Sequence, residues 1–359
     1  MRRTTLAAVA AVAALSLATA GCSTNDDSSA EETTASSATT ASDATQAADE
    51  DTSGAGIDQS EFPVTTTDWV GHSETFTEKP ERVAILSGTP LNVWYDTGGE
   101  AVATSMLSDN ILLAEDYADE IRTIEQLGPP FAIDAEKLAA LNPDLVITLS
   151  GPQDQIATQL QGMGIATITA QINSFDELTT AYTMFGALNG EPEAAEERIA
   201  EISEEIDAVT DQWPSDEETS TAILHVTGDG VSAKLDDSIA GDVSTRLGLR
   251  NVFSGTTGTT GATGATETIP LDIEALVKEQ PEYILVTSMT GSNEEARETL
   301  QAEFDSNPAW QSVDAVREDR VVFLPQQYFL YNAGPNYADA VEYLAASIHP
   351  DIYGDPVEP

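Results

Sequence analysis

The chain repeats one residue pattern in its two halves, 138 positions apart. Residues 133–147 carry Asp, Glu and Leu at alternate positions, then a Pro and an apolar run, and residues 271–285 repeat them in register. The same offset aligns two earlier apolar runs, 83–86 and 221–224. Each half therefore contains a strand, a stretch of intervening chain, and then a helix, a Pro and a second strand. Two similar α/β lobes predict a cleft between them, where small ligands tend to bind.

The first 22 residues have the pattern of an export signal. Two arginines at positions 2–3 precede an apolar stretch at 6–18, and small residues at 20–21 come before Cys22. The stretch is shorter than the ~20 residues that span a bilayer, which disfavours the alternative of a retained membrane helix. The arginine pair leaves open whether export uses the general or the twin-arginine route.

Cys22 is the single cysteine of the sequence. This excludes an intramolecular disulfide, a cysteine-based metal cluster and a cysteine nucleophile in the folded part. The segment resembles the lipobox of bacterial lipoproteins, although Thr19 stands where that pattern usually has Leu. The resemblance implies that Cys22 is lipidated and anchors the protein on the extracytoplasmic face of the cell membrane. Two or more acyl chains, at ~0.8 kcal/mol per buried methylene, would make such an anchor stable.

Residues 23–60 consist almost wholly of Ser, Thr, Ala, Asp and Glu. Such a segment cannot bury enough apolar surface to offset the entropy of ordering it, so it is predicted to be a disordered tether. Its root-mean-square reach would be roughly 35 Å.

The sequence has 62 acidic and 14 basic residues, a net charge of −48. Nucleic acid is excluded as a partner, because binding it requires clustered Lys and Arg. The acidity is spread along the chain and is interpreted as a solvated surface suited to high salt or to solubility. The alternative, an acidic patch that collects cations, lacks a dense carboxylate cluster such as an EF-hand loop.

The remaining chain is predicted to be α/β, with two Rossmann-like lobes of mostly parallel sheets at 61–190 and 214–359. In the first lobe, apolar strands alternate with helices, which favours sheets covered on both faces. The expected elements are strands at 82–86, 101–104, 145–149 and 166–168, a helix from Pro90, a short helix capped by Asp134 and a helix at 153–163.

Residues 191–213 form the predicted connection between the lobes. Ala195, Ile199, Ile202, Ile206, Val209 and Trp213 recur at spacings of three and four, which indicates a long amphipathic helix. A coiled-coil dimer is the competing interpretation of the same spacing. As a spacer about 30 Å long, the helix would let the lobes open and close little.

Taken together, these segments resemble a substrate-binding lipoprotein of an ABC importer. The Ser-Gly-Thr-Pro turn at 87–90, the two Glu-x-Leu…Pro-x-x-strand units and the long helix carry the resemblance, with support from 307–310, 319–324 and the helix expected at 337–348. The subclass with a single connecting helix serves iron-siderophore, haem and cobalamin uptake. The resemblance implies a monomer without enzymatic activity or cofactor, which captures a metal chelate and delivers it to the importer permease.

Glu136 and Glu274 are the predicted docking residues. In the resembled family a glutamate at this place on each lobe contacts an arginine of the permease. The alternative is simple helix-end chemistry, because an acidic side chain in the first turn stabilises a helix by ~0.3–1 kcal/mol. Both explanations can hold together.

Ligand contacts are expected from loops at the strand ends that face the cleft. Trp94 and the 326–331 stretch are favoured because aromatic faces suit a bulky ligand, although core packing is the alternative for Trp94 and for both tyrosines, and a simple turn for Asp229. The full predicted set is Ser87, Gly88, Thr89, Trp94, Met106, Ser150, Gly151, Gly228, Asp229, Lys234, Met289, Thr290, Gln326, Tyr328 and Tyr331.

Lys234 is the one obvious cation of this set. A triply anionic catecholate would require several, so neutral or cationic chelates and cobalamin are favoured. Haem would need an axial ligand such as Met106, His225 or a tyrosine, but His225 lies within a strand and is better explained by packing. The scattered histidines do not have the spacing of a metal site.

The sequence also bears on two other functions. An enzyme would need a nucleophile with a base, or paired carboxylates, and the sequence shows neither a Gly-x-Ser-x-Gly elbow nor a histidine constellation. A sensor or adhesion lipoprotein that no longer transports remains open. Residues 254–268 are of low complexity and are predicted to be a loop.

Overall fold

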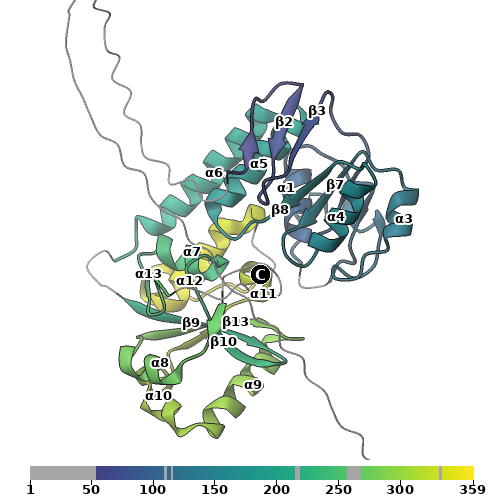
Figure 1. The fold of residues 1–359 in the computed structure, drawn as a ribbon. Helices are drawn as coiled ribbons and strands as arrows, with labels where there is room; N and C mark the ends of the chain where they lie inside the picture. Colours follow the sequence, from purple (N-terminus) through teal and green to yellow (C-terminus); the bar gives the residue numbers. More distant parts are fainter. Residues whose placement is uncertain (1–53, 109–110, 115, 215–218, 257–267, 331–333) are drawn as a thin grey trace, which may run out of the picture. The chain divides into compact units, whose positions relative to one another are not determined.

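The computed structural model describes residues 54–108, 111–114, 116–214, 219–256, 268–330 and 334–359 (Figure 1). Within them the strands form an antiparallel sheet in the order β1-β2-β3, a sheet in the order β6-β5-β4-β7-β8, and a sheet in the order β12-β10-β9-β13-β14 with β11 beside β9. No helix of this described part is long and apolar enough to cross a membrane. The signal peptide, Cys22 and most of the predicted tether lie outside the described residues.

The first lobe is built on a five-stranded parallel sheet. Parallel strands need crossover connections, and helices supply most of them here. Apolar clusters cover both faces of the sheet, one around Leu138 and Leu160 and the other around Leu91 and Phe185. The elements are β4 Val83–Ile85, α1 Gly88–Asp96, β5 Ala103–Thr104, α2 Ala118–Ile121, β6 Glu125–Gln126, α3 Ala135–Ala140, β7 Leu145–Leu149, α4 Asp154–Gly162, β8 Thr167–Ala170 and α5 Phe175–Asn189.

The second lobe combines parallel strands with an antiparallel edge. β11, β9, β13 and β14 are parallel neighbours, whereas β10 and β12 run antiparallel. The predicted α/β class with mostly parallel sheets is confirmed. The elements are β9 Ser220–Thr227, β10 Gly230–Lys234, α7 Ile239–Arg246, β11 Arg250–Asn251, β12 Thr268–Pro270, α8 Ile273–Glu279, β13 Tyr283–Met289, α9 Asn293–Ser306, η1 Pro308–Ser312, α10 Asp314–Arg317, β14 Val321–Phe323, α11 Gln326–Phe329, η2 Gly334–Asn336, α12 Tyr337–Ile348 and α13 Pro350–Tyr353.

The repeat in the sequence is a repeat of strand pairing. In the first lobe Val83 of β4 pairs with Leu145 of β7, and in the second Thr221 of β9 pairs with Tyr283 of β13. Each position in the second pair lies 138 residues after its counterpart in the first. The two copies therefore form the same two central strands in the same register.

An acidic residue joins these strands in each lobe. Asp144 accepts a hydrogen bond from the backbone N–H of Arg82 at 2.9 Å. At the equivalent positions Glu282 accepts one from the N–H of Ser220, at 3.4 Å. These carboxylates satisfy backbone donors that precede the central strand of each sheet.

A small antiparallel sheet precedes the first lobe and corrects the predicted end of the tether at residue 60. Its strands are β1 Gly56–Ile57, β2 Val64–Thr67 and β3 Ser73–Phe76. Ile57 packs against the main apolar cluster, so ordered chain begins earlier than composition indicates. The buried Asp68 fixes this sheet to the lobe, because its Oδ2 accepts a hydrogen bond from the N–H of Thr169 at 2.8 Å.

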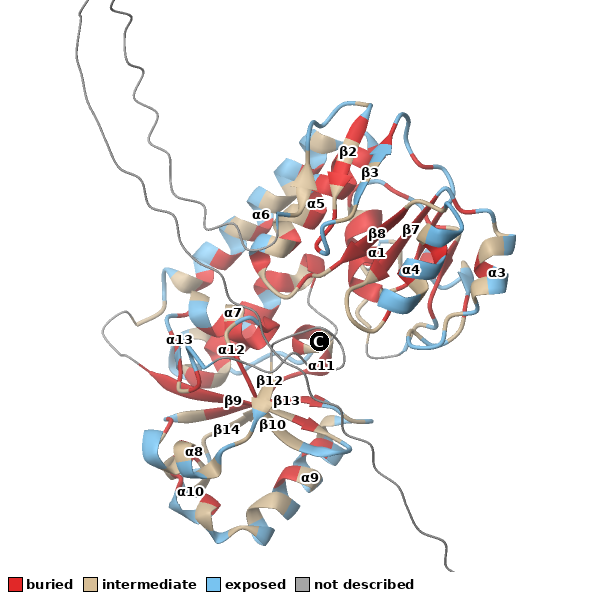
Figure 2. Cartoon of the chain, in the orientation of Figure 1, coloured by how far each residue is buried: buried red, intermediate tan, exposed pale blue. Residues whose placement is uncertain are grey.

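The helix predicted at 191–213 is α6, Pro192–Thr210. It packs against α5 on one side and α12 on the other, and Ala195, Ile202, Ile206 and Val209 are buried (Figure 2). The apolar stripe that a coiled-coil dimer would have used is therefore covered within the chain. The apolar cluster that contains Ile202 extends from the first lobe to α12 and to one face of the second sheet.

Candidate ligand-binding site

The loops after β4, β5, β6 and β7 share one edge of the first sheet, because these strands are parallel. Among the predicted residues here, Ser87 is half-buried at the N-cap of α1, and Gly88 and Thr89 are buried in its first turn. Ser150 and Gly151 are half-buried after β7. Of this set, the two residues after β7 and Ser87 retain surface that a ligand could reach.

Gln153 holds this edge together and was not singled out from the sequence. Its buried side-chain amide donates to the carbonyls of Leu86 at 2.7 Å and Pro130 at 3.1 Å. Its Oε1 accepts from the N–H of Leu149 at 2.8 Å. One side chain therefore joins the ends of β4 and β7 to the loop before α3. No sequence pattern marks a glutamine for this role.

Phe131 and Met106 are the exposed apolar side chains of the same edge. Their side chains are 69% and 48% exposed, respectively. The N–H of Met106 donates to the carbonyl of Gly128 at 2.7 Å, which ties the two loops together. Met106 was predicted as a ligand contact, and Phe131 was missed. The Gly-Pro-Pro before Phe131 marks a rigid loop and was the available signal.

In the second lobe, the predicted contacts lie at the β9–β10 turn and after β13. Gly228 and Asp229 are exposed, and the N–H of Asp229 donates to Thr227 Oγ1 at 3.2 Å, so this segment is also an ordinary turn. Met289 is 51% exposed at the end of β13. Thr290 is half-buried beside it. These residues offer one carboxylate and one thioether.

Gln326 has a structural role at the end of β13. Its buried amide donates to Ser288 Oγ and to the carbonyl of Thr290, both at 3.0 Å. Like Gln153 of the first lobe, it uses its side-chain amide to hold backbone at a strand end. It therefore positions Thr290, in contrast to the direct ligand contact that was predicted.

Of the two tyrosines predicted in the 326–331 stretch, the structure describes only Tyr328. Tyr328 is buried and packs edge-on against Phe329 and Tyr343, with ring centroids 6.5 and 6.3 Å apart. Burial raises the pKa of Tyr328 to about 12. Tyr331 lies outside the described residues. Core packing, the alternative interpretation, thus explains why most of the Tyr328 ring is buried.

Trp94 also lies in the core, which corrects its prediction as a favoured ligand contact. The side chain is fully buried, and its ring meets Phe185 edge-on at 5.6 Å. Its indole N–H donates to the carbonyl of Glu100 at 3.1 Å. A Cβ at Gly99 would lie 2.2 Å from the indole nitrogen, so the surrounding chain fits the ring closely. Core packing, the alternative interpretation, explains this tryptophan.

Lys234 and His225 lie on neighbouring strands of the second sheet. Lys234 is buried, so the one cation predicted for the cleft is not displayed on the surface. His225 is half-buried with Nδ1 3.0 Å from Thr287 Oγ1, and burial, together with the charge of Lys234, lowers its pKa to about 4. His225 is therefore neutral at neutral pH.

Glu136 and Glu274 occupy matching positions on α3 and α8. Both are exposed in the first turn of their helix. Asp134 caps α3 by accepting from the N–H of Lys137 at 2.9 Å, and Asp272 caps α8 by accepting from the N–H of Glu274 at 3.0 Å. The aspartates, and not the glutamates, accept from these first-turn N–H groups, and both glutamates are exposed.

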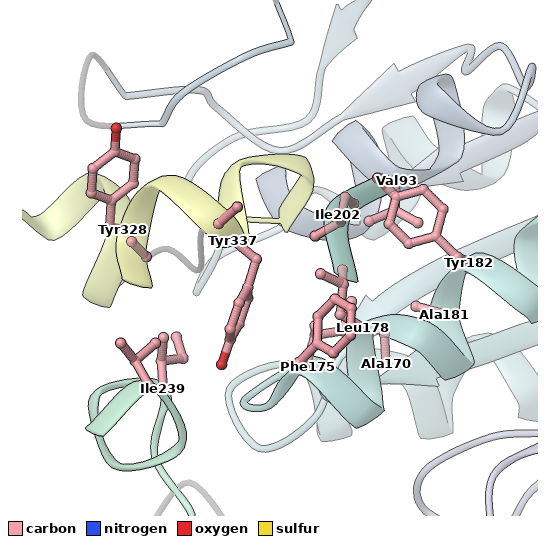
Figure 3. Packing of buried hydrophobic residues seen from close by; sticks show 14 of the residues in the cluster. Val93, Ala170, Phe175, Leu178, Ala181, Tyr182, Ile202, Ile239, Tyr328 and Tyr337 are labelled. Atoms are coloured by element: carbon pink, nitrogen blue, oxygen red, sulfur yellow. The ribbon is translucent and has the colours of Figure 1, made fainter. Parts of the chain in front are cut away.

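A half-buried carboxylate, Asp242 of α7, connects the two lobes. Its Oδ2 accepts from Arg246 Nε at 2.8 Å, from the N–H of Phe175 at 3.2 Å, and from the hydroxyl of Tyr337. Arg246 also pairs with Asp176 at 3.2 Å. Figure 3 shows Tyr337 between Ile239 on one side and Phe175 on the other. The start of α5 is thus fixed to α7 and α12.

A second carboxylate, Asp96 of α1, also accepts hydrogen bonds from a tyrosine and an arginine. Asp96 Oδ2 accepts from the hydroxyl of Tyr182 at 2.5 Å and from Arg198 Nε at 3.1 Å. Burial, with the charge of Asp96, raises the pKa of Tyr182 well above its ordinary value. Arg198 of α6 also reaches the carbonyl of Pro335 at 3.4 Å. The long helix is therefore joined by polar contacts to both lobes.

A cavity of 1130 Å³ lies away from the strand-end loops, lined by α9 and β14 residues such as Arg297 and Phe323. None of the predicted ligand residues lines it. In the parts of the chain that the structure describes, no three His, Cys, Asp or Glu side chains gather as a metal site. The described strand-end loops offer both polar and apolar surface for binding.

Comparison with known proteins identifies the family. The periplasmic binding protein family matches residues 83–328, which include the parallel sheet of the first lobe, α6 and the sheet of the second lobe. The chain belongs to this family. Its members are substrate-binding proteins of ABC transporters and in general are not enzymes.

Three similar proteins show how far the likeness extends. An uncharacterised ABC transporter substrate-binding lipoprotein, YvrC of Bacillus subtilis, is 25% identical over 85% of this chain and 92% of its own length. A cobalamin-binding protein of Halobacterium salinarum is 26% identical, over 48% of this chain and 46% of its own. The solved structure of an Fe³⁺-hydroxamate transport protein from Saccharomonospora viridis has a TM-score of 0.62 and 20% identity, covering 80% of this chain and 99% of that one.

Proposed function

We propose that this periplasmic binding protein is a lipid-anchored receptor that captures an iron-siderophore or related chelate, with cobalamin and haem as further possibilities, and delivers it to an ABC importer permease. The observation that carries the proposal is the duplicated pair of central strands, which gives each lobe a strand-end edge built in the same way. Cobalamin and Fe³⁺-hydroxamate are named for similar proteins, which supports this ligand class.

Delivery is assigned to Glu136 and Glu274. The two glutamates lie 138 residues apart in the repeat, and each is exposed in the first turn of a helix with an aspartate cap. Two carboxylates, one on each lobe, match a permease made of two subunits. Asp134 and Asp272 cap the two helices, which supports a role for the exposed glutamates other than capping.

The test combines binding and transport. Protein lacking the signal peptide is titrated with cyanocobalamin, a ferric hydroxamate and haemin by isothermal calorimetry, and uptake of any bound chelate is measured in cells of the source organism. We expect the double variant Glu136→Ala/Glu274→Ala to bind with unchanged Kd and to lose uptake. Loss of binding by the variant, or wild-type uptake, would contradict the docking assignment.

Glu193→Ala is the matched control. Glu193 is an exposed acidic residue in the first turn of α6, so it shares the helix-end chemistry of the docking pair. If helix-end stabilisation explained the phenotype, this variant would show a comparable effect. We expect it to transport normally. Absence of binding to every chelate would refute the proposed ligand class itself.

A further inference from the structure

The residues that directly follow the strands carry almost no charge, although the chain as a whole has a net charge of −48. Farther along the chain, the segment between β5 and α2 contains Asp109, Glu115 and Asp116. In the first lobe, residues 87–89, 105–108, 128–132 and 150–152 contain no acidic or basic side chain. In the second lobe, the described loops 227–230, 288–292 and 325–330 contain one, Asp229. On a chain that is strongly acidic overall, these described strand ends therefore carry no Lys or Arg and a single carboxylate.

Two of the acidic residues that flank these loops are engaged in capping. Asp134 accepts from the N–H of Lys137 at 2.9 Å, and Asp154 accepts from the N–H of Gly151 at 2.8 Å. Both carboxylates therefore accept hydrogen bonds from backbone N–H groups, one in a helix and one in a turn. Lys234 is buried on β10, so it does not offset this lack of positive charge on the described loops.

From this distribution we infer that the ligand is a neutral or cationic metal chelate with an apolar face, and that Phe131 and Met106 bind that face. The inference rests on the proposed function and narrows its ligand class. An anionic chelate would lose its hydration without gaining Arg or Lys partners on these loops, which disfavours its binding. Asp229 would favour a positive charge on the side of the second lobe.

Exposed apolar side chains gather at the same loops. Among the described residues seven large hydrophobic side chains are exposed, and three of them, Met106, Phe131 and Met289, lie on strand-end loops of the two lobes. The backbone next to Phe131 is held in advance, because Gln153 donates to the neighbouring Pro130 carbonyl at 3.1 Å. An aromatic ring on a fixed loop binds an apolar ligand surface with little loss of conformational entropy.

Four probes of different charge test the ligand class by calorimetry: cyanocobalamin is neutral, ferrioxamine B is cationic, and ferric enterobactin and haemin are anionic. Tight binding of the neutral or cationic probe, with the anionic probes at least about 100-fold weaker, is the expected result. Preference for an anionic probe would overturn the inference while leaving the proposed function intact. Failure of all four would refute both.

The Phe131→Ala variant tests the contact itself. Loss of a ring buried by the ligand should raise the Kd by about 10- to 100-fold. Met163→Ala is the control, because Met163 has a comparable exposure of 52% but follows α4, away from the strand ends. Thermal unfolding of both variants checks that the fold is retained. An unchanged Kd for Phe131→Ala would overturn the contact, and a loss of uptake at unchanged Kd would place Phe131 at the permease surface.

The Asp229→Asn variant separates charge from apolar contact. It should weaken ferrioxamine B several-fold more than cyanocobalamin, because only the cation is attracted by the carboxylate. Equal effects on the two probes would show that Asp229 does not contribute through its charge.

Discussion

Asn142 and Gln280, 138 residues apart, have the same left-handed backbone conformation, with φ at +47° in each. Each follows the helix of its repeat unit and is followed by the proline that leads into a buried strand. Side chains other than Gly are rare in this conformation, because the Cβ approaches the backbone. The duplication therefore preserves a backbone detail as well as the order of elements.

Replacing these two residues with glycine should change the free energy of unfolding in opposite directions. Asn142→Gly relieves the left-handed conformation and should be neutral or stabilising by up to about 1 kcal/mol. Gln280→Gly also removes an amide that donates to the carbonyls of Val277 at 2.7 Å and Ser312 at 2.8 Å and accepts from the N–H of Asp314 at 2.9 Å. It should destabilise by about 1–3 kcal/mol.

Urea denaturation of both glycine variants measures the difference in free energy of unfolding. A stabilising effect at both sites would show that backbone strain dominates. A similar loss at both would show that the side-chain contacts of Gln280 contribute little.

Replacing Asp242 with Ala should be strongly destabilising. The change leaves the Arg246 guanidinium and the Tyr337 hydroxyl without their common acceptor in a mostly buried place, where the side chains of the ion pair are 25% and 18% exposed. Breaking such a pair costs about 3 kcal/mol or more. The measurement is the midpoint of thermal unfolding.

Asp314→Ala is the control for Asp242→Ala. The Asp314–Arg317 pair is also local in sequence, but its side chains are 45% and 49% exposed. Exposed pairs contribute at most about 1 kcal/mol. Comparable losses for the two variants would contradict a special role for Asp242 between the lobes.

The fold was predictable where local chemistry and tertiary structure agree. Asp134 caps α3 as its position before an apolar helix pattern indicates. The strand expected at 145–149 is β7, and the helix expected at 337–348 is α12. Helix α5 carried no such signal, because most of it is buried on all sides and its apolar residues lack a period.

The site was less predictable because long-range contacts decide which side chains remain exposed. Trp94 follows a strand-end turn, as a ligand contact would, yet the contact with Phe185 places it in the core. Gln153 and Gln326 are polar residues next to strand ends whose amides are used inside the protein. For Phe131 the sequence offered only the Gly-Pro-Pro that precedes it, and the structure adds that the side chain is exposed.

Salt should stabilise the protein. With a net charge of −48, the native state carries strong repulsion between carboxylates, which counterions screen with a Debye length of about 10 Å at 0.1 M salt and about 3 Å at 1 M. We expect the melting temperature to rise steadily between these concentrations of NaCl. Choline chloride should have the same effect if screening is responsible, and a melting temperature insensitive to both salts would contradict the role of repulsion.

His225 should make stability depend on pH. Burial, with the charge of Lys234, lowers its pKa from 6.5 to about 4, so the unfolded chain binds a proton more readily than the native protein. The contribution of neutral His225 is complete above pH 6.5 and is lost as the pH falls towards 4. The loss should amount to about 3 kcal/mol.

The His225→Gln variant isolates this contribution from the carboxylates that titrate in the same range. Glutamine can still bond to Thr287 Oγ1 but does not titrate. The wild-type protein should therefore lose stability relative to the variant between pH 7 and pH 4, measured by urea denaturation at each pH. His72→Gln is the control, because His72 pairs with Glu74 on the half-exposed β3 strand. A wild-type-to-variant difference that stays constant with pH would show that His225 does not titrate in this window, and that its surroundings are more hydrated than its burial indicates.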